Sequence, residues 1–292
     1  MTSPQWLKAL PRSFQECARY MTPEQISNFL DDAIRNRIAV RLIAEQHIAL
    51  SRTVVRDEHD NDHIGIVQLS CSPRDMIRMC ASFVGDLCEA TLGTSPRIDI
   101  DGEVDATFAY VPVHLEYILT EILKNSFRAT VEWHQKHHSS ASLSPIPPVL
   151  ITISPPPSPS SPQSPRYLSM RIRDQGGGVT PADMSRIFSY SFTTAGRGAE
   201  AFEWDDADLG GGPYAAQHVG GSAAVDGPSS GAEFGSESLF AEMAGRGVQM
   251  GMGTIAGLGY GLPMSHLYAR YFGGSLDFFS LDGWGSDFII FL

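Results

Sequence analysis

The pattern of apolar and polar positions predicts three long helices in the first half of the chain. Apolar residues recur three or four positions apart over residues 23–52, 73–92 and 112–137, which is the period of an amphipathic helix. Thr22 precedes the first run, with Pro23 at its first position and Gln25 at the capping-box position, a combination typical of a helix start. The apolar stripe of this first helix needs another helix, or the domain that follows, to pack against.

Short strands follow and alternate with the later helices. Strands are predicted at 97–102, 106–111, 148–154, 167–174, 274–281 and 285–292, and a further helix at 264–272. Helices come first and a mixed layer of strands and helices comes after them. This order predicts an α+β sandwich in which helices cover one face of a mixed sheet.

Two stretches interrupt this pattern. Residues 154–166 contain the Pro/Ser tract "PPPSPSSPQSP", which cannot extend a sheet. We interpret it as an exposed hairpin insertion, with a phosphorylation or docking segment as the alternative. Residues 196–256 are rich in Gly, Ala and Ser and far exceed an ordinary loop, which is typical of a lid or a disordered insertion.

Charge and hydropathy exclude several classes of partner. The net charge is −12 and no Lys/Arg-rich run occurs, which argues against nucleic acid or an anionic membrane surface as the main partner. No apolar run approaches the ~18 residues needed to span a bilayer. The N-terminal "MTSPQWLKALPRSFQECARY" lacks the apolar core of a secretory signal, and a weak organelle-transit character stays open.

The helix at 112–137 carries the first candidate for chemistry, "EILKNSFRA". Glu121, Lys124, Asn125 and Arg128 are spaced so that all four lie on one helix face, while apolar residues occupy the opposite positions. A solvated, salt-bridged face would explain the charged residues. It would not explain an asparagine in the centre of a helix.

Two glycine-rich segments carry the second and third candidates. In "RIRDQGGGV" a strand leads directly into Asp174 and three glycines, where the backbone can approach a ligand and the carboxylate can accept from an exocyclic amine such as that of adenine. A plain turn is the alternative. In "GLGYGL", residues 257–262, backbone amides at a helix N-terminus suit polyphosphate, although the spacing matches neither the dinucleotide fingerprint nor a Walker loop.

Together and in this order, the three segments resemble the ATP-binding boxes of the GHKL superfamily of ATPases and kinases. "ILTEILKNSFRATVE", "DQGGGV", "SFTTA" and "GLGYGLPMSHLYARYFGGSLDFFSLDGWGSD" are similar to the mitochondrial pyruvate dehydrogenase kinase and branched-chain α-ketoacid dehydrogenase kinase family. The resemblance implies a GHKL (Bergerat-type) sandwich over 71–292, preceded by a partial N-terminal helical bundle over 1–70. It further suggests a fungal-type member with insertions and a truncated bundle.

The resemblance implies a role for each matching residue. Asn125 is expected to bind Mg²⁺, and Glu121 to act as general base on a serine hydroxyl and to line the nucleotide site. Lys124 and Arg128 are expected to neutralise or position phosphates, and Asp174 to bind adenine. The other expected nucleotide contacts are Gly176, Gly178, Thr193, Thr194, Gly257, Leu258, Gly259, Tyr260, Gly261 and Leu262. Some members carry a histidine where this chain has Tyr117, which leaves assistance to the base open.

The implied function is ATP- and Mg²⁺-dependent phosphorylation of the dehydrogenase component of the mitochondrial pyruvate dehydrogenase complex, by positioning and charge neutralisation. A branched-chain α-ketoacid dehydrogenase kinase and an ATP-binding module without transfer activity stay open as alternatives. The expected location is the mitochondrial matrix. The lipoyl domain of the complex core and a second copy of the chain are the further partners that the resemblance suggests.

Overall fold

The computed structural model describes residues 20–56, 61–137, 145–155, 167–190 and 261–292. The predicted contacts Thr193, Thr194 and residues 257–260 lie outside these ranges, as do nearly all of the stretch 154–166 and the whole of 196–256. The chain divides into two compact units at Glu45/Gln46. Of the first unit, the structure describes residues 20–45, of which residues 23–45 belong to helix α2 (Pro23–Arg56). All other described residues belong to the second unit.

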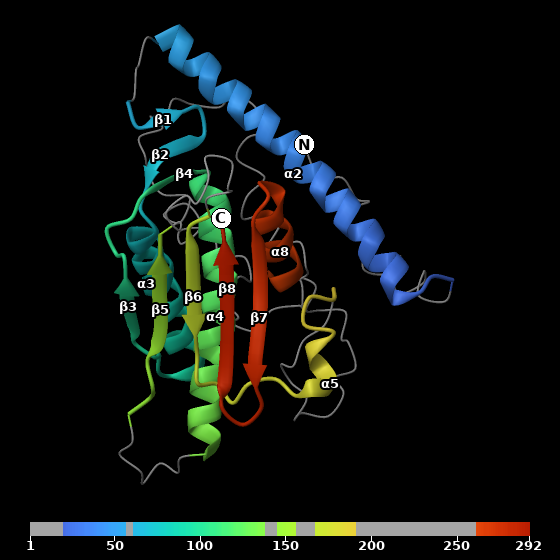
Figure 1. Cartoon of the computed structure of the whole chain (residues 1–292), viewed down its shortest axis with the longest axis vertical. Coiled ribbons are helices and arrows are strands. Elements are labelled where there is room, and N and C mark those ends of the chain that lie inside the picture. The colour runs from blue at the N-terminus through green and yellow to red at the C-terminus, as the bar shows by residue number, and fades with distance from the viewer. Residues whose placement is uncertain (1–19, 57–60, 138–144, 156–166, 191–260) are drawn as a thin grey trace, which may run out of the picture. The chain divides into compact units, whose positions relative to one another are not determined.

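A mixed sheet of five strands forms the centre of the second unit (Figure 1). Its strands are β3 (Ile98–Gly102), β5 (Val149–Ser154), β6 (Ser169–Arg173), β7 (Ser275–Leu281) and β8 (Gly285–Phe291). They lie in the order β3-β5-β6-β8-β7, with β3 and β5 parallel and every other pair antiparallel. The predicted α+β class with a mixed sheet is confirmed.

Helices α3 (Pro73–Leu92) and α4 (Pro112–His137) cover one face of this sheet (Figure 1). The strands turn alternate residues toward the helices, so that Ile151, Met170, Ile172 and Ile290 are almost fully buried while their neighbours in sequence are more exposed. The same core takes in Ile118, Leu119, Ile122 and Leu123 of α4. Helix α8 (Gly261–Tyr271) packs against α4 and β7.

Local chemistry explains where α3 begins and ends. Ser72 caps its N-terminus by accepting a hydrogen bond from the Asp75 amide at 3.3 Å, and Pro73 occupies the first turn. Gly93 ends the helix in the left-handed region, at φ 77°, and donates its N–H to the Glu89 carbonyl. These signals are all present in the sequence, and the predicted helix at 73–92 agrees with the observed one.

Two strands and one short helix were not predicted. The unpredicted strands β1 (His63–Ile64) and β2 (Val67–Cys71) join β4 (Phe108–Tyr110), which lies in the predicted strand 106–111, in an antiparallel sheet of order β1-β2-β4. The unpredicted helix α5 (Pro181–Met184) follows the glycine turn after β6. Gln46 of α2 accepts a hydrogen bond from the Ile66 amide at 2.8 Å and donates to the Ile64 carbonyl.

No helix in the described ranges has the length and apolar character needed to cross a bilayer.

Candidate functional site

The predicted polar face of α4 exists, and it is not a solvated face. Glu121 is only 9% exposed although it carries a charge. Its Oε1 pairs with Lys124 Nζ at 2.5 Å, and the Lys124 side chain is itself 20% exposed. A carboxylate this buried requires a partner, because an unpaired buried charge is strongly unfavourable. The ion pair with Lys124 therefore compensates the buried negative charge of Glu121.

The other two members of this face differ in what they contact. Arg128 Nε pairs with Glu132 Oε1 at 2.8 Å, one turn farther along the helix. The side-chain amide of Asn125 makes no hydrogen bond to another described residue, although its side chain is partly buried. Among the residues that the structure covers, Asn125 thus keeps its amide group available to a ligand.

Helix α8 begins directly against Glu121. Gly261 is its first residue, and a Cβ added there would overlap the Glu121 carboxylate. Only glycine permits this close approach without displacing the acidic side chain. Of the predicted glycine loop, the structure thus describes Gly261 and Leu262, and it brings Gly261 to the polar face of α4.

Tyr117 lies one turn before Glu121, on the same side of α4. Its hydroxyl donates to the sulfur of Met264 on α8 at 3.5 Å. Burial raises the pKa of Tyr117 well above its ordinary value, and the negative charge of Glu121 raises it further. The hydroxyl therefore stays protonated and neutral at physiological pH.

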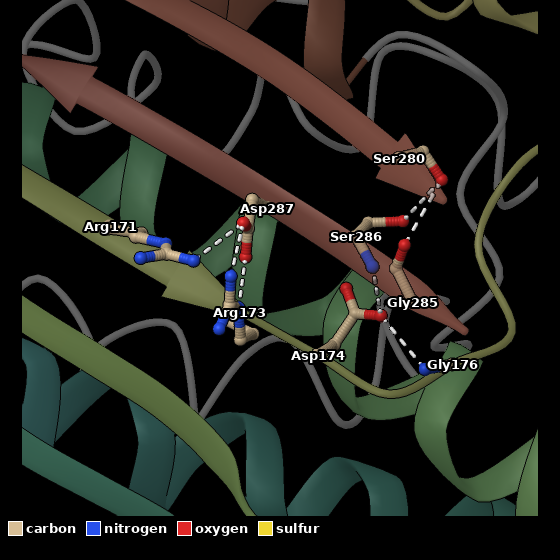
Figure 2. Close-up of polar contacts among 8 residues, drawn as sticks. All are labelled: Arg171, Arg173, Asp174, Gly176, Ser280, Gly285, Ser286 and Asp287. Carbon is tan, nitrogen blue, oxygen red and sulfur yellow. Dashed lines mark hydrogen bonds and ion pairs between the residues drawn. The ribbon is translucent and has the colours of Figure 1, made fainter. Parts of the chain in front are cut away.

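Asp174 lies at the end of β6 and is buried, with 3% of its surface exposed. Its Oδ1 accepts hydrogen bonds from the amides of Gly176, at 2.9 Å, and Ser286, at 3.2 Å (Figure 2). Ser126 of α4 faces the same carboxylate, outside hydrogen-bonding geometry. Burial raises the pKa of Asp174 to about 6, and the two amides limit the rise, so the group is mostly an ionised acceptor at neutral pH.

The glycines after Asp174 bring the backbone against α4. A Cβ on Gly176 would overlap Ala129, and one on Gly177 would overlap the ring of Trp133. Gly177 and Gly178 also have positive φ values of 80° and 72°, which L side chains rarely adopt. The three glycines therefore form a turn that requires glycine for its backbone conformation and that packs directly against α4, the helix that carries Glu121.

Glu121 and Ala129 mark the two ends of the candidate site on α4. They are eight residues apart, which at ~1.5 Å per residue places them about 12 Å apart along the helix. The Glu121 end holds an ion pair and the start of α8, and the available amide of Asn125 lies midway between Glu121 and Ala129. The other end holds a buried carboxylate beside a glycine turn. A ligand with a base at one end and phosphates at the other matches this division of chemistry.

Sequence reasoning missed the residues that support the Asp174 turn from the β7–β8 hairpin. Ser286 donates its amide to Asp174, and a Cβ on Gly285 would overlap the Asp174 carbonyl. Ser280 accepts a hydrogen bond from the Val179 amide at 2.7 Å. The Asp-Gly pair in "SLDGWGSD" is a signal typical of a hairpin turn, but no local pattern indicates that β8 lies beside β6.

The chain is similar in sequence to known mitochondrial kinases. Residues 5–68 match the family model described as mitochondrial branched-chain alpha-ketoacid dehydrogenase kinase. The [pyruvate dehydrogenase (acetyl-transferring)] kinase, mitochondrial, of Arabidopsis thaliana is 29% identical over 265 residues, which cover 90% of this chain and 56% of the relative. Isozyme 3 of Mus musculus is 30% identical over 274 residues, covering 91% and 51%.

Isozyme 3 of Homo sapiens is 29% identical over 274 residues, covering 91% of this chain and 52% of the relative. The chain thus spans about half the length of the curated relatives it matches. The fold is the α+β sandwich that the resemblance implies. The chain is thus similar over about 90% of its length to mitochondrial pyruvate dehydrogenase kinases, and residues 5–68 match the family described as mitochondrial branched-chain alpha-ketoacid dehydrogenase kinase.

Proposed function

We propose that the chain is an ATP-dependent protein serine/threonine kinase that phosphorylates, and thereby inhibits, the dehydrogenase component of the mitochondrial pyruvate dehydrogenase complex. One observation carries the proposal: a glycine turn seats the buried Asp174 carboxylate on the helix that bears Glu121 and Asn125. The names of the relatives, which are pyruvate dehydrogenase kinases, support the same activity.

At the base end of the site, Asp174 accepts a hydrogen bond from the exocyclic amine of adenine. Both amide hydrogen bonds to this carboxylate end on Oδ1, which leaves Oδ2 for a ligand. Gly176 and Gly178 let the backbone lie close to the base, since neither presents a side chain. Guanine has a carbonyl where adenine has the amine, so the site selects ATP over GTP.

At the phosphate end, Asn125 supplies an oxygen ligand for Mg²⁺, which prefers oxygen donors. Bound Mg²⁺ neutralises phosphate charge during transfer. Lys124 and Arg128 supply positive charge beside the phosphates, and Glu121 takes the proton of the substrate serine. The further nucleotide contacts that we propose are Thr193, Thr194, Gly257, Leu258, Gly259, Tyr260, Gly261 and Leu262.

A branched-chain α-ketoacid dehydrogenase is the second candidate substrate. It is favoured by the family model that matches residues 5–68, whose description names a branched-chain kinase. We further propose a partial helical bundle over 1–70, a kinase domain over 71–292 and a mitochondrial matrix location. The lipoyl domain of the complex core and a second copy of the chain are the partners that we propose.

The test is a phosphorylation assay with the full chain, Mg²⁺ and γ-labelled ATP. Pyruvate dehydrogenase and branched-chain α-ketoacid dehydrogenase components are offered in separate reactions. We expect acid-stable serine phosphorylation of the pyruvate dehydrogenase component. Glu121→Gln should lower the rate by roughly 100-fold while ATP still binds, because a general base contributes about that much.

Each other outcome contradicts a defined part of the proposal. Phosphorylation of the branched-chain component alone identifies the second candidate. Tight ATP binding without transfer to either component identifies a nucleotide-binding module. A chain that binds no ATP refutes the assignment of the site itself.

A further inference from the structure

The β7–β8 hairpin holds the candidate adenine turn along its whole length. The Asp174 amide donates to the Ser286 carbonyl at 2.9 Å, which continues the pairing of β6 with β8 past the end of the strand. The Gly177 amide donates to the Trp284 carbonyl at 3.1 Å, and the Gly283 amide donates back to the Gly177 carbonyl at 2.8 Å. The turn is thus bound to the tip of the hairpin as well as to α4.

Ser280 ties the exit of the turn to the same hairpin. Its Oγ accepts from the Val179 amide at 2.7 Å and lies 3.3 Å from the Gly285 carbonyl and 3.2 Å from Ser286 Oγ (Figure 2). A hydroxyl has one proton, so it donates to one of these two oxygens while it accepts from Val179. One side chain of β7 therefore links β8 to the residue that follows the three glycines.

The two serines act at opposite ends of the turn. Ser286 contacts the Asp174 carboxylate at the entrance, and Ser280 contacts the Val179 amide at the exit. Between them the chain passes through Gly177 and Gly178, both with positive φ, which have no side chain to anchor them. Removing the Ser280 hydroxyl would leave the Val179 amide without this acceptor and would also remove a neighbour of Ser286.

We infer that Ser280 is a positioning residue of the nucleotide site: it fixes the turn after Asp174, and thereby the direction in which the Asp174 carboxylate faces the base. The inference rests on the proposed function, since it requires adenine to bind at Asp174. Ser280 acts through Val179 and Ser286 and does not itself contact the nucleotide. Its loss should impair recognition of the base more than the binding of the triphosphate.

The experiment compares ATP and GTP affinity by calorimetric titration of the full chain and four variants. Ser280→Ala removes the hydroxyl, and Ser280→Thr retains one. Ser275→Ala is the matched control, because Ser275 lies on the same strand and its hydroxyl contacts only Asp277, at 3.3 Å, among the described residues. Asp174→Asn alters the carboxylate itself and reports whether adenine binds there.

We expect Ser280→Ala to bind ATP about tenfold more weakly than wild type, as a lost hydrogen bond with an unsatisfied amide implies. GTP affinity should change little, so the preference for ATP should shrink. Ser280→Thr should restore the preference, and Ser275→Ala should match the wild type. Amide exchange at Val179 should be slow in the wild type and in Ser280→Thr, which provides a readout even if the alanine variant folds poorly.

Three results would overturn the inference while leaving the proposed function standing. The first is an unchanged ATP preference in Ser280→Ala while Asp174→Asn loses it. The second is an equal weakening of ATP and GTP binding in both Ser280 variants, which indicates general support of the fold. The third is fast Val179 exchange in the wild type, which indicates that Ser280 does not hold this amide. A wild-type chain that binds no ATP, or an Asp174→Asn variant with unaltered preference, refutes the proposed site and the inference with it.

Discussion

Two of the buried carboxyl groups on or beside α4, Asp174 and Glu116, differ in their hydrogen-bond donors. Asp174 has the amides of Gly176 and Ser286. Glu116 is 7% exposed, and its Oε1 has no hydrogen-bond partner among the described residues. Burial raises the pKa of Glu116 to about 7. Two hydrogen-bond donors thus stabilise the charged form of Asp174, whereas ionising Glu116 lowers the free energy of unfolding.

The pH dependence of stability should reveal this cost. The pKa of Glu116 in the folded state lies above its ordinary value of 4.5, so the folded state binds more protons than the unfolded state between pH ~4.5 and ~7. The free energy of unfolding therefore falls as the pH rises through this window. Glu116→Gln removes the penalty, and it should be more stable than wild type by about 2–3 kcal/mol at pH 8 and nearly equal to it at pH 4.5.

Urea unfolding at a series of pH values measures this effect. Glu89→Gln is the control, because Glu89 is exposed on α3 and should show no such dependence. A difference between Glu116→Gln and wild type that is the same at pH 4.5 and pH 8 would contradict the argument.

At the scale of elements, two glycines can be compared, one in the turn after β6 and one in the turn of the β7–β8 hairpin. Both have a positive φ, but only the first is tightly packed. Gly178 has φ 72° and Gly283 has φ 81°. A Cβ on Gly178 would overlap the Leu281 carbonyl, whereas a Cβ on Gly283 would meet nothing within 4 Å. Comparing substitutions at Gly178 and Gly283 therefore distinguishes the cost of backbone strain from the cost of steric overlap.

Gly178→Ala should destabilise the protein more than Gly283→Ala. Both variants incur the strain of a positive φ, about 1–2 kcal/mol, and only Gly178→Ala must also displace a strand carbonyl. We expect a further loss of about 1–3 kcal/mol at Gly178, in the range of overpacking. Denaturant unfolding of both variants measures the difference, and equal losses would show that the turn and the hairpin are not in the close contact described above.

The element scale also shows why some predictions succeeded and others did not. The predicted helices at 73–92 and 112–137 agree with α3 and α4, because caps, prolines and apolar spacing act within a few residues. Strands β1 and β2 were missed, since two and five residues with partial exposure carry little alternation. β2 depends on pairing with β4, about 40 residues farther along the chain, and β1 pairs in turn with β2.

At the scale of the whole molecule, the second unit gathers the site from segments far apart in the sequence. α4, the turn after β6, the start of α8 and the β7–β8 hairpin all contribute. A ligand that contacts several of these segments binds the folded state and not the unfolded state, and it therefore stabilises the fold. ATP binding should therefore be visible as increased thermal stability of the chain.

Mg²⁺ and ATP at 100 times the dissociation constant should stabilise the protein by about 2.7 kcal/mol. For a chain of this size, that corresponds to a rise in Tm of roughly 5–10 °C. Differential scanning calorimetry measures it. Asp174→Asn at the same ATP concentration should show little rise, and an equal rise in both proteins would place the nucleotide elsewhere.

The sequence by itself determined every described helix except the short α5, most strands, the α+β class and the residue types of the candidate site. It could do so because helical period, capping and glycine content are local properties. It also indicated that Glu121, Lys124, Asn125 and Arg128 share a face, which follows from helix geometry alone.

Only the tertiary structure decided what surrounds these residues. It buried Glu121 against Lys124 and Gly261, and it placed β8 between β6 and β7, so that Ser286 reaches Asp174 and Ser280 reaches Val179. Strand order and burial depend on contacts between residues more than a hundred positions apart. No local pattern encodes such contacts, because they form only when the whole sheet and its covering helices pack together.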